Sequence, residues 1–167
     1  GAKETDRSVV LPAREYALKK QELDKKYLNV VVMAMELPDG TIVTGRSSRR
    51  MVAAGACILN AVKKLAGLPD PLYVISPEVF SNMQNLKVEV LHHDRTSLNV
   101  DDILTALSIS ADMNENANKT VGMLSRLNGC KAHCTAILSD NDEQTLRAMG
   151  IDVTCDPEYL TTNLYLG

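Results

Sequence analysis

Continuous apolar runs in the first half of the chain predict a β-hairpin followed by a buried helix. Residues 29–37 are apolar almost throughout and predict a strand. Pro38-Asp39-Gly40 has the chemistry of a turn, because proline fixes φ at the first corner and glycine supplies a positive φ. Residues 41–45 are therefore expected to return as the antiparallel partner. Residues 51–66 then predict a helix that is apolar nearly all round, which is typical of a buried helix.

The helix at residues 51–66 begins with four small residues, which should let its backbone approach the sheet closely. They are Ala53, Ala54, Gly55 and Ala56.

The opening segment of the chain predicts a less buried helix. Residues 12–28 predict a helix with Pro12 in its first turn and a narrow apolar stripe made of Tyr16, Leu23 and Tyr27. Such a stripe covers little core, so we expect this helix to lie at an edge or against something outside the chain.

The second half predicts four helices and three short strands. Residues 72–76 predict a short buried strand, and Ser76-Pro77-Glu78 a helix start with a capping hydroxyl and a first-turn proline. Residues 131–138 and 151–155 predict the last strands. Apolar residues at helical spacing mark the first helix at Val79, Met83, Leu86 and Val90, and the second at Val100, Ile103, Leu104 and Leu107. The third is marked by Ala117, Val121 and Leu124, with Asn114 as its cap. The fourth begins at an Asp140–Glu143 capping box and ends near Met149.

This order of elements predicts a three-layer α/β/α fold built on a mixed sheet.

The chain has 167 residues, 45% of them hydrophobic, and a net charge of −3. That charge and the six aromatic residues disfavour nucleic-acid binding. No 18-residue apolar stretch predicts a membrane span, and no signal peptide is evident, so we expect a cytoplasmic location. The chain does not open with methionine, which predicts that it is one piece of a longer protein.

Seven cysteine and histidine residues could suggest a metal site, but strand geometry argues against one. Cys130 and Cys134 are four strand residues apart, or roughly 13 Å, and His133 points to the opposite face. One zinc ion needs every ligand within about 2.3 Å. We therefore expect no metal and no cofactor, with small buried thiols in a reducing compartment. The full set is Cys57, Cys130, Cys134, Cys155, His92, His93 and His133.

A basic run precedes the buried helix and is the first candidate site. Three arginines at a helix N-terminus oppose the helix dipole, and such places often bind an anion through backbone N–H groups and guanidinium forks. The alternative is that Ser48 caps the helix while the arginines extend into water or meet another domain. The candidate ligands of a phosphate-bearing small molecule are Arg46, Ser47, Ser48, Arg49 and, at the next helix start, Ser76. Glu78 is the candidate general acid or base, and that role requires burial.

Short segments along the chain resemble the C-terminal part of the uncharacterised bacterial DUF 1846 family. They are Met35 to Gly45, Leu59-Asn60-Ala61, Leu65-Ala66-Gly67, Ile75 to Val79, Leu104 to Ile109, Gly129-Cys130, Ala132-His133, Ile137-Leu138-Ser139 and Gly150 to Pro157. The resemblance implies a fold like that of the cytidine deaminases, and a longer parent protein whose glycine-rich phosphate-binding segment lies upstream. Arg49 and Arg50 depart from the usual family pattern.

The zinc chemistry of the deaminases does not carry over with the fold. Zinc deaminases use H-x-E at one helix start and P-C-x-x-C at the next. Here the corresponding positions are Met51-Val52-Ala53 and Pro77-Glu78-Val79-Phe80-Ser81, which keep the proline but lack the histidine and both cysteines. The resemblance therefore names no reaction.

Two hypotheses of function follow. In the first, residues 1–28 form a linking helix, and residues 29–167 form a domain that acts in assembly or completes a ligand site. Its partners would be the upstream domain of the same protein and a second copy in a homo-oligomer. In the second, the domain is an enzyme with its own site for an anionic small molecule at two helix N-termini. Neither hypothesis involves nucleic acid or a membrane.

Overall fold

A four-stranded mixed sheet forms the centre of the computed structural model, which describes residues 3–23 and 29–157. Its order is β2-β1-β3-β4, with β1 antiparallel to both β2 and β3 and with β4 parallel to β3. The strands are β1 (Val32–Glu36), β2 (Ile42–Arg46), β3 (Lys131–Cys134) and β4 (Asp152–Cys155). The predicted hairpin is confirmed, with Glu36 opposite Ile42 and a φ of 88° at Gly40 in the turn.

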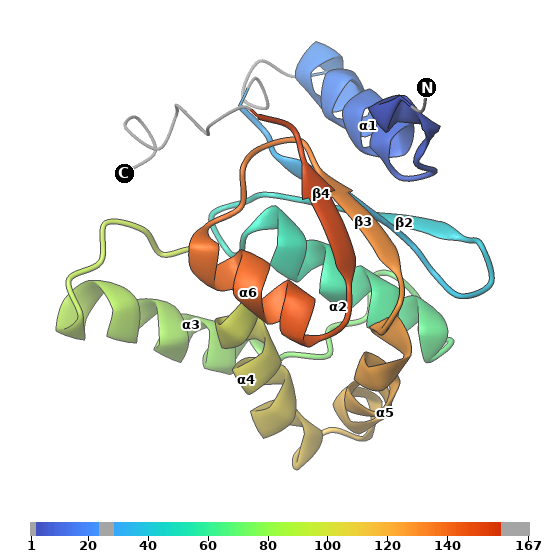
Figure 1. The fold of residues 1–167 in the computed structure, drawn as a ribbon. Coiled ribbons are helices and arrows are strands. Elements are labelled where there is room, and N and C mark those ends of the chain that lie inside the picture. The colour runs from blue at the N-terminus through green and yellow to red at the C-terminus, as the bar shows by residue number, and fades with distance from the viewer. Residues whose placement is uncertain (1–2, 24–28, 158–167) are drawn as a thin grey trace.

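Helices cover both faces of this sheet, which confirms the three-layer α/β/α architecture (Figure 1). On one face lies α1 (Val10–Leu23), preceded by the short helix η1 (Glu4–Asp6). The opposite side holds α2 (Ala53–Leu65), α3 (Pro77–Asn85) with its π-helical extension η3 (Leu86–Val90), α4 (Val100–Ala111), α5 (Glu115–Met123), η4 (Leu124–Leu127) and α6 (Asp140–Ala148). None of the described helices is both long and apolar enough to cross a bilayer.

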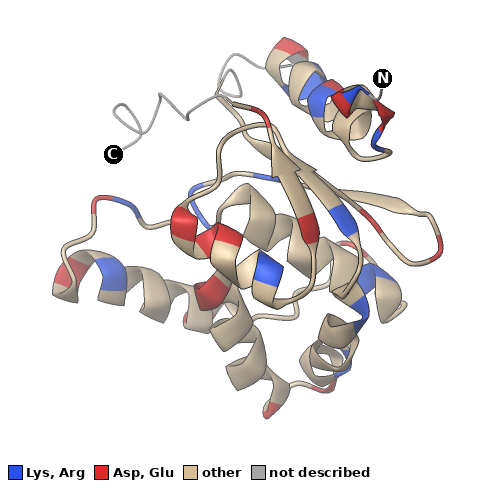
Figure 2. Ribbon diagram, in the orientation of Figure 1, with Lys and Arg blue, Asp and Glu red and all other residues tan. Residues whose placement is uncertain are grey.

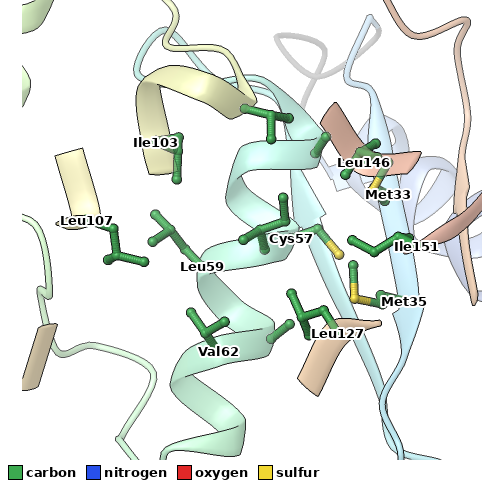
Figure 3. Packing of buried hydrophobic residues seen from close by; sticks show 14 of the residues in the cluster. Met33, Met35, Cys57, Leu59, Val62, Ile103, Leu107, Leu127, Leu146 and Ile151 are labelled. Carbon is green, nitrogen blue, oxygen red and sulfur yellow. The ribbon is translucent and has the colours of Figure 1, made fainter. Parts of the chain in front are cut away.

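Alternation along β1 divides the core into two parts. Met33 and Met35 point toward α2 and join the larger cluster, whereas Val32 and Ala34 point toward α1 and join a small one. Figure 3 shows α2 between the sheet residues and the side chains of α4. Every residue of α2 from Cys57 to Val62 except Asn60 is buried, as its nearly uniform apolar pattern predicts.

The closest approach of α2 to the sheet depends on a glycine of the strand. A Cβ atom at Gly45 of β2 would lie 2.2 Å from the backbone nitrogen of Cys57 and 2.7 Å from the carbonyl carbon of Ala56. Gly55, which we expected to face the sheet, instead faces α4, where a Cβ would lie 2.9 Å from Cγ1 of Ile103. The predicted close contact exists, but Gly45 makes it possible.

Two strand predictions need correction. Residues 72–76 form no strand, although Val74 and Ile75 are buried. This run contributes Val74 and Ile75 to the larger core and pairs with none of the four described strands, so it packs without joining the ladder. The strand predicted for residues 131–138 ends at Cys134, because its partner β1 begins at Val32 and pairing stops one residue later, at Thr135.

Two helix predictions are also wrong in detail. The first helix begins at Val10, not Pro12, and its fully buried residues are Val10, Ala13 and Ala17, while Tyr16 of the predicted stripe packs partly buried against the same small cluster. The end of that predicted helix, residues 24–28, lies outside the described residues. The last helix is capped by Ser139, whose hydroxyl accepts a hydrogen bond from the Asp142 N–H, and not by an Asp140–Glu143 box.

Candidate functional site

An open cleft of about 250 Å³ lies along the outer side of β2. We call it the β2 cleft. Its polar lining comes from three parts of the chain: Tyr16 of α1, Thr44 and Arg46 of β2 with the following Ser48, and Asn60 of α2. The Asn60 side-chain amide donates a 2.8 Å hydrogen bond to the Thr44 carbonyl and so fastens the edge of β2 to α2. The cleft therefore has a fixed floor of strand and helix backbone.

The helical repeat of α1 explains how Tyr16 reaches this cleft. Ala13 and Ala17 are buried against the sheet, and at 3.6 residues per turn Arg14 and Tyr16 fall on opposite flanks of that buried stripe. Arg14 bonds to Asp156 beyond β4, whereas Tyr16 lines the cleft beside β2. α1 thus lies over β1, with its Tyr16 flank toward β2 and its Arg14 flank toward the segment that follows β4.

The N-terminus of α2 differs from the sequence-based expectation. Met51 forms a parallel bridge with Leu98, and the Val52 N–H donates to the Leu98 carbonyl, so both residues are extended and the helix begins at Ala53. The Ser48 hydroxyl accepts from the N–H groups of Arg50 and Met51 at 3.2 and 3.4 Å, which makes a turn before the helix. Ser48 therefore does not cap α2, whose N-cap is Val52.

The structure brings two of the predicted ligand residues together and separates the others. Arg46 and Ser48 both line the β2 cleft. The Ser47 hydroxyl instead accepts from the Val31 N–H at 2.9 Å and closes the end of the hairpin. The Arg49 side chain is exposed, and its carbonyl accepts hydrogen bonds from Gln84, Thr96 and Ser97 of the neighbouring segments.

Ser76 and Glu78 belong to the start of α3 and are not among the residues that line the cleft. The Ser76 hydroxyl caps α3 by accepting from the Val79 N–H, as predicted. Glu78 is exposed in the first turn of that helix, where its charge suits the dipole. It therefore lacks the burial that a general acid or base at this position requires.

Cys130, His133 and Cys134 lie on the faces that strand alternation predicts. Cys130 and Cys134 join the larger core, while His133 lies on the opposite face of β3. Burial raises the pKa of Cys57 and raises that of Cys134 to about 12, so both are thiols at neutral pH. Across residues 3–23 and 29–157, no group of three or more histidine, cysteine or acidic side chains could hold a metal ion.

A polar network that local sequence patterns do not reveal lies under α1. Nδ1 of buried His133 is 2.7 Å from Oγ1 of Thr154, and its Nε2 is 3.0 Å from Oδ1 of Asp156. Asp156 also accepts two hydrogen bonds from Arg14, at 2.6 and 3.3 Å, and Arg14 reaches Glu4 at 2.6 Å. Burial would raise the pKa of Asp156, but the bonds from Arg14 and His133 outweigh it and lower that pKa.

This network fastens the N-terminal layer to the sheet. Arg7 adds bonds from its guanidinium to the Asp152 carboxylate and to the backbone carbonyls of Ala132 and Asp152. Its hydrogen-bonded pairs are up to 145 residues apart in sequence, so only the fold brings them together. Both ring nitrogens of His133 have a protein partner at hydrogen-bond distance, which gives the residue a structural role in holding α1.

The β2 cleft has the chemistry of a binding site. Arg46 is a permanent cation with several donors, and Ser48, Thr44 and Tyr16 add hydroxyl groups, a set that suits an anionic group. Of the described residues that line the cleft, none carries a carboxylate, thiol or imidazole. The cleft alone therefore supplies no nucleophile–base pair.

Comparisons with known proteins place this domain in a family. Curated UPF0371 proteins from Clostridium botulinum (strain Langeland / NCTC 10281 / Type F), Clostridium tetani (strain Massachusetts / E88) and Clostridioides difficile (strain 630) are 52%, 48% and 48% identical over 163 residues. Each match covers 98% of this chain but 32% of the relative, so the chain spans about a third of the length of these relatives. The family model described as "Domain of unknown function DUF1846, C-terminal" matches residues 5–165, and the chain therefore belongs to this DUF1846 family.

Proposed function

We propose that this domain completes a ligand site together with the upstream part of the full-length protein, and that the ligand carries a phosphate or another anionic group. The observation that carries the proposal is the β2 cleft, where Arg46 and Ser48 lie on one side of an open hollow. A cleft whose described lining residues offer donors for an anion but no carboxylate, thiol or imidazole suits a site whose reactive half comes from elsewhere. Ligand sites occur preferentially where two domains meet.

The position of α1 supports a shared site. About two thirds of the length of the curated relatives lies outside the matched part, and the family model describes a C-terminal domain. The upstream part then joins the domain through the residues before η1. η1 contacts α1, and α1 supplies Tyr16 to the cleft.

The outer face of α1 has the character of a surface that the upstream part would cover. Leu11 and Leu18 are seven residues apart, on one face of the helix, and their exposed fractions are 48% and 58%. They lie on the side away from the buried Ala13 and Ala17. Exposed apolar side chains of this kind, flanked by charged residues, mark contact surfaces. Upstream structure seated on this face would also extend over the neighbouring cleft.

The experiment uses inorganic phosphate as the probe and the melting temperature as the readout. Phosphate should stabilise the full-length protein by about 2.7 kcal/mol at a hundred times its dissociation constant. Arg46→Gln should abolish this protection, because it removes the guanidinium from the cleft. Arg49→Gln is the matched control, because its exposed side chain lies outside the cleft, and it should leave the protection intact. Protection that survives Arg46→Gln, or its absence in the wild type, would refute the proposal.

A comparison of the 167-residue chain with the full-length protein tests whether the site is shared. A shared site predicts that phosphate binds the full-length protein several-fold more tightly than this chain alone. Equal affinities would instead support the alternative hypothesis, an anion site that the domain completes by itself. In that case the upstream part would be unnecessary for binding.

A further inference from the structure

The two parallel strands β3 and β4 lie side by side (Figure 1), and each ends in a cysteine. Cys134 of β3 and Cys155 of β4 are register partners, and we call them the cysteine pair. The Asp156 N–H donates a 2.9 Å hydrogen bond to the Cys134 carbonyl and joins the strands at this point. Val153, two residues before Cys155, belongs to the same core cluster as Cys134, so strand alternation places both thiols on one face of the sheet.

The two members of the cysteine pair differ in their exposure to solvent. Cys134 is only 2% exposed, whereas Cys155 is an exposed free thiol. Free cysteine is among the residue types most often buried, so an exposed thiol beside a buried one is unusual. Burial is the main cause that raises the pKa of Cys134 to about 12, and the neighbouring Cys155 thiol adds to it. A dissolved oxidant therefore meets Cys155 before Cys134.

The spacing of the cysteine pair permits a disulfide within the folded sheet. Neighbouring strands lie about 4.8 Å apart, and disulfides join Cα atoms that are about 4.4–6.8 Å apart. Register partners of parallel strands point the same way, so their Cβ atoms are about as far apart as their Cα atoms, somewhat beyond the 3.5–4.5 Å usual in a disulfide. A disulfide at this position would be strained, and strained disulfides are easily reduced again.

The surroundings of the cysteine pair leave one competing partner among the described cysteines. Lys131 and Asp152 begin the two strands, and Figure 2 shows no Lys, Arg, Asp or Glu along the rest of β3 and β4. Cys57 of α2 also lies near Cys134, because its pKa, raised mainly by burial, is raised further by Cys134. Cys57 is fully buried, however, so an oxidant reaches it only when the core opens.

We propose that Cys155 is a site of reversible oxidation by hydrogen peroxide and that Cys134 is its resolving cysteine. In the first step the Cys155 sulfur attacks the peroxide, the O–O bond breaks, and a sulfenic acid and water form. In the second step the Cys134 sulfur attacks the sulfenic sulfur, the S–S bond forms, the S–O bond breaks, and the Cys134 proton leaves with the hydroxide as water. Two electrons pass from the two thiols to the peroxide, and an external dithiol returns them.

Peptide mapping tests the proposal, because trypsin places the four cysteines on four different peptides. The native chain is treated with hydrogen peroxide, the remaining thiols are alkylated after denaturation, and the unreduced digest is examined by mass spectrometry. A disulfide should link residues 132–147 to residues 148–167, and the free thiols should fall from four to two. Dithiothreitol should separate these peptides and restore all four thiols.

Three variants assign the steps to single residues. Cys155→Ser should leave Cys134 reduced under the same treatment. Cys134→Ser should stop Cys155 at the sulfenic acid, which dimedone traps. Cys130→Ser is the matched control, because Cys130 is a buried cysteine outside the pair, and it should form the same linked peptide as the wild type.

The other outcomes would each overturn the proposal. A link between residues 51–63 and 132–147 would make Cys57 the partner of Cys134. Cys155 that is oxidised to the sulfinic or sulfonic acid without any link would show that Cys134 does not resolve it. A link only between two copies of Cys155, with a yield that rises with protein concentration, would show an intermolecular reaction. Retention of all four thiols would show that Cys155 is not oxidised. None of these results depends on phosphate, so the ligand proposal stands or falls separately.

Discussion

Gly45→Ala adds a single methyl group at the contact between β2 and α2, and we expect it to destabilise the domain strongly. The new Cβ atom would lie 2.2 Å from the Cys57 nitrogen and 2.6 Å from the Cys57 Cα. Ordinary van der Waals contact between such atoms is about 3.5–4.0 Å. The atoms in the way belong to the backbone of α2, so no side-chain rotation can relieve the overlap.

The expected cost follows from what must move. Either α2 shifts away from the sheet and loosens the core around Cys57 and Ile58, or β2 bends and loses its register with β1. Overpacking of a core typically costs about 1–3 kcal/mol, and a backbone clash lies at the upper end of that range. At about 2–4 °C per kcal/mol for a domain of this size, the melting temperature should fall by about 6–12 °C.

Two further glycines make a graded series for a denaturation experiment in urea. Gly55→Ala places its Cβ 2.9 Å from Cγ1 of Ile103, an inner atom of a fully buried, β-branched side chain, so its cost should lie between those of Gly45→Ala and Gly122→Ala even after the gain in helix propensity. Gly122→Ala in α5 meets nothing within 4 Å and should stabilise by about 0.5–1 kcal/mol. If Gly45→Ala unfolds within about 0.5 kcal/mol of the wild type, α2 does not approach β2 as described.

Three other measurements test the interior. Asp156→Asn should cost about 2 kcal/mol at neutral pH, less than a fully buried pair because its arginine partner is partly exposed. The pKa of Asp156 is lowered in the fold, so its contribution to stability is present above the unfolded-state pKa, about 3.9, and is lost as pH falls through the folded value. In urea unfolding between pH 7 and pH 3, the variant should therefore lose less of its unfolding free energy than the wild type. Iodoacetamide should modify exposed Cys155 in the native chain but spare Cys57 and Cys134, as mass spectrometry can show; equal labelling would contradict the burial. Asp142→Ala removes the acceptor of the buried Val100 N–H at the start of α4 and should cost about 1–3 kcal/mol in thermal unfolding. Asp142→Asn keeps an acceptor oxygen and should cost less. Equal losses in the two variants would mean that this hydrogen bond is unimportant.

Features set by neighbouring residues could be predicted from the sequence. The hairpin around Gly40, the cap at Ser76 and the cap at Asn114 depend on a few adjacent side chains, and the structure has all three. The cap of α6 was displaced by one residue because Ser139 and Asp140 are both good capping residues, and local sequence does not decide between them.

Features set by distant residues could not be predicted. A buried apolar run such as residues 72–76 suits a strand or a packed loop equally well, and the choice depends on whether the rest of the fold brings the run beside an open edge of the sheet. The same reason hides the network under α1, since Arg14 and the Asp156 that it shares with His133 come from opposite ends of the chain. Arg46 and Ser48 could be identified as a pair because they are close in sequence. The likeness to the cytidine deaminases and the boundary at residue 28 remain predictions.

The central position of β1 has a consequence for how the chain folds during synthesis. Its hairpin partner follows within ten residues, but its other neighbour, β3, begins about 95 residues after β1 ends. At about 5–20 residues per second, a ribosome takes about 5–20 s to make that stretch. Throughout this time Met33, Ala34 and Met35 lie on a strand with one bare edge, which is a template for pairing between nascent chains. We therefore expect chains truncated before β3 to aggregate, and the intact chain to depend on chaperones that shield β1 until its C-terminal partner has been made.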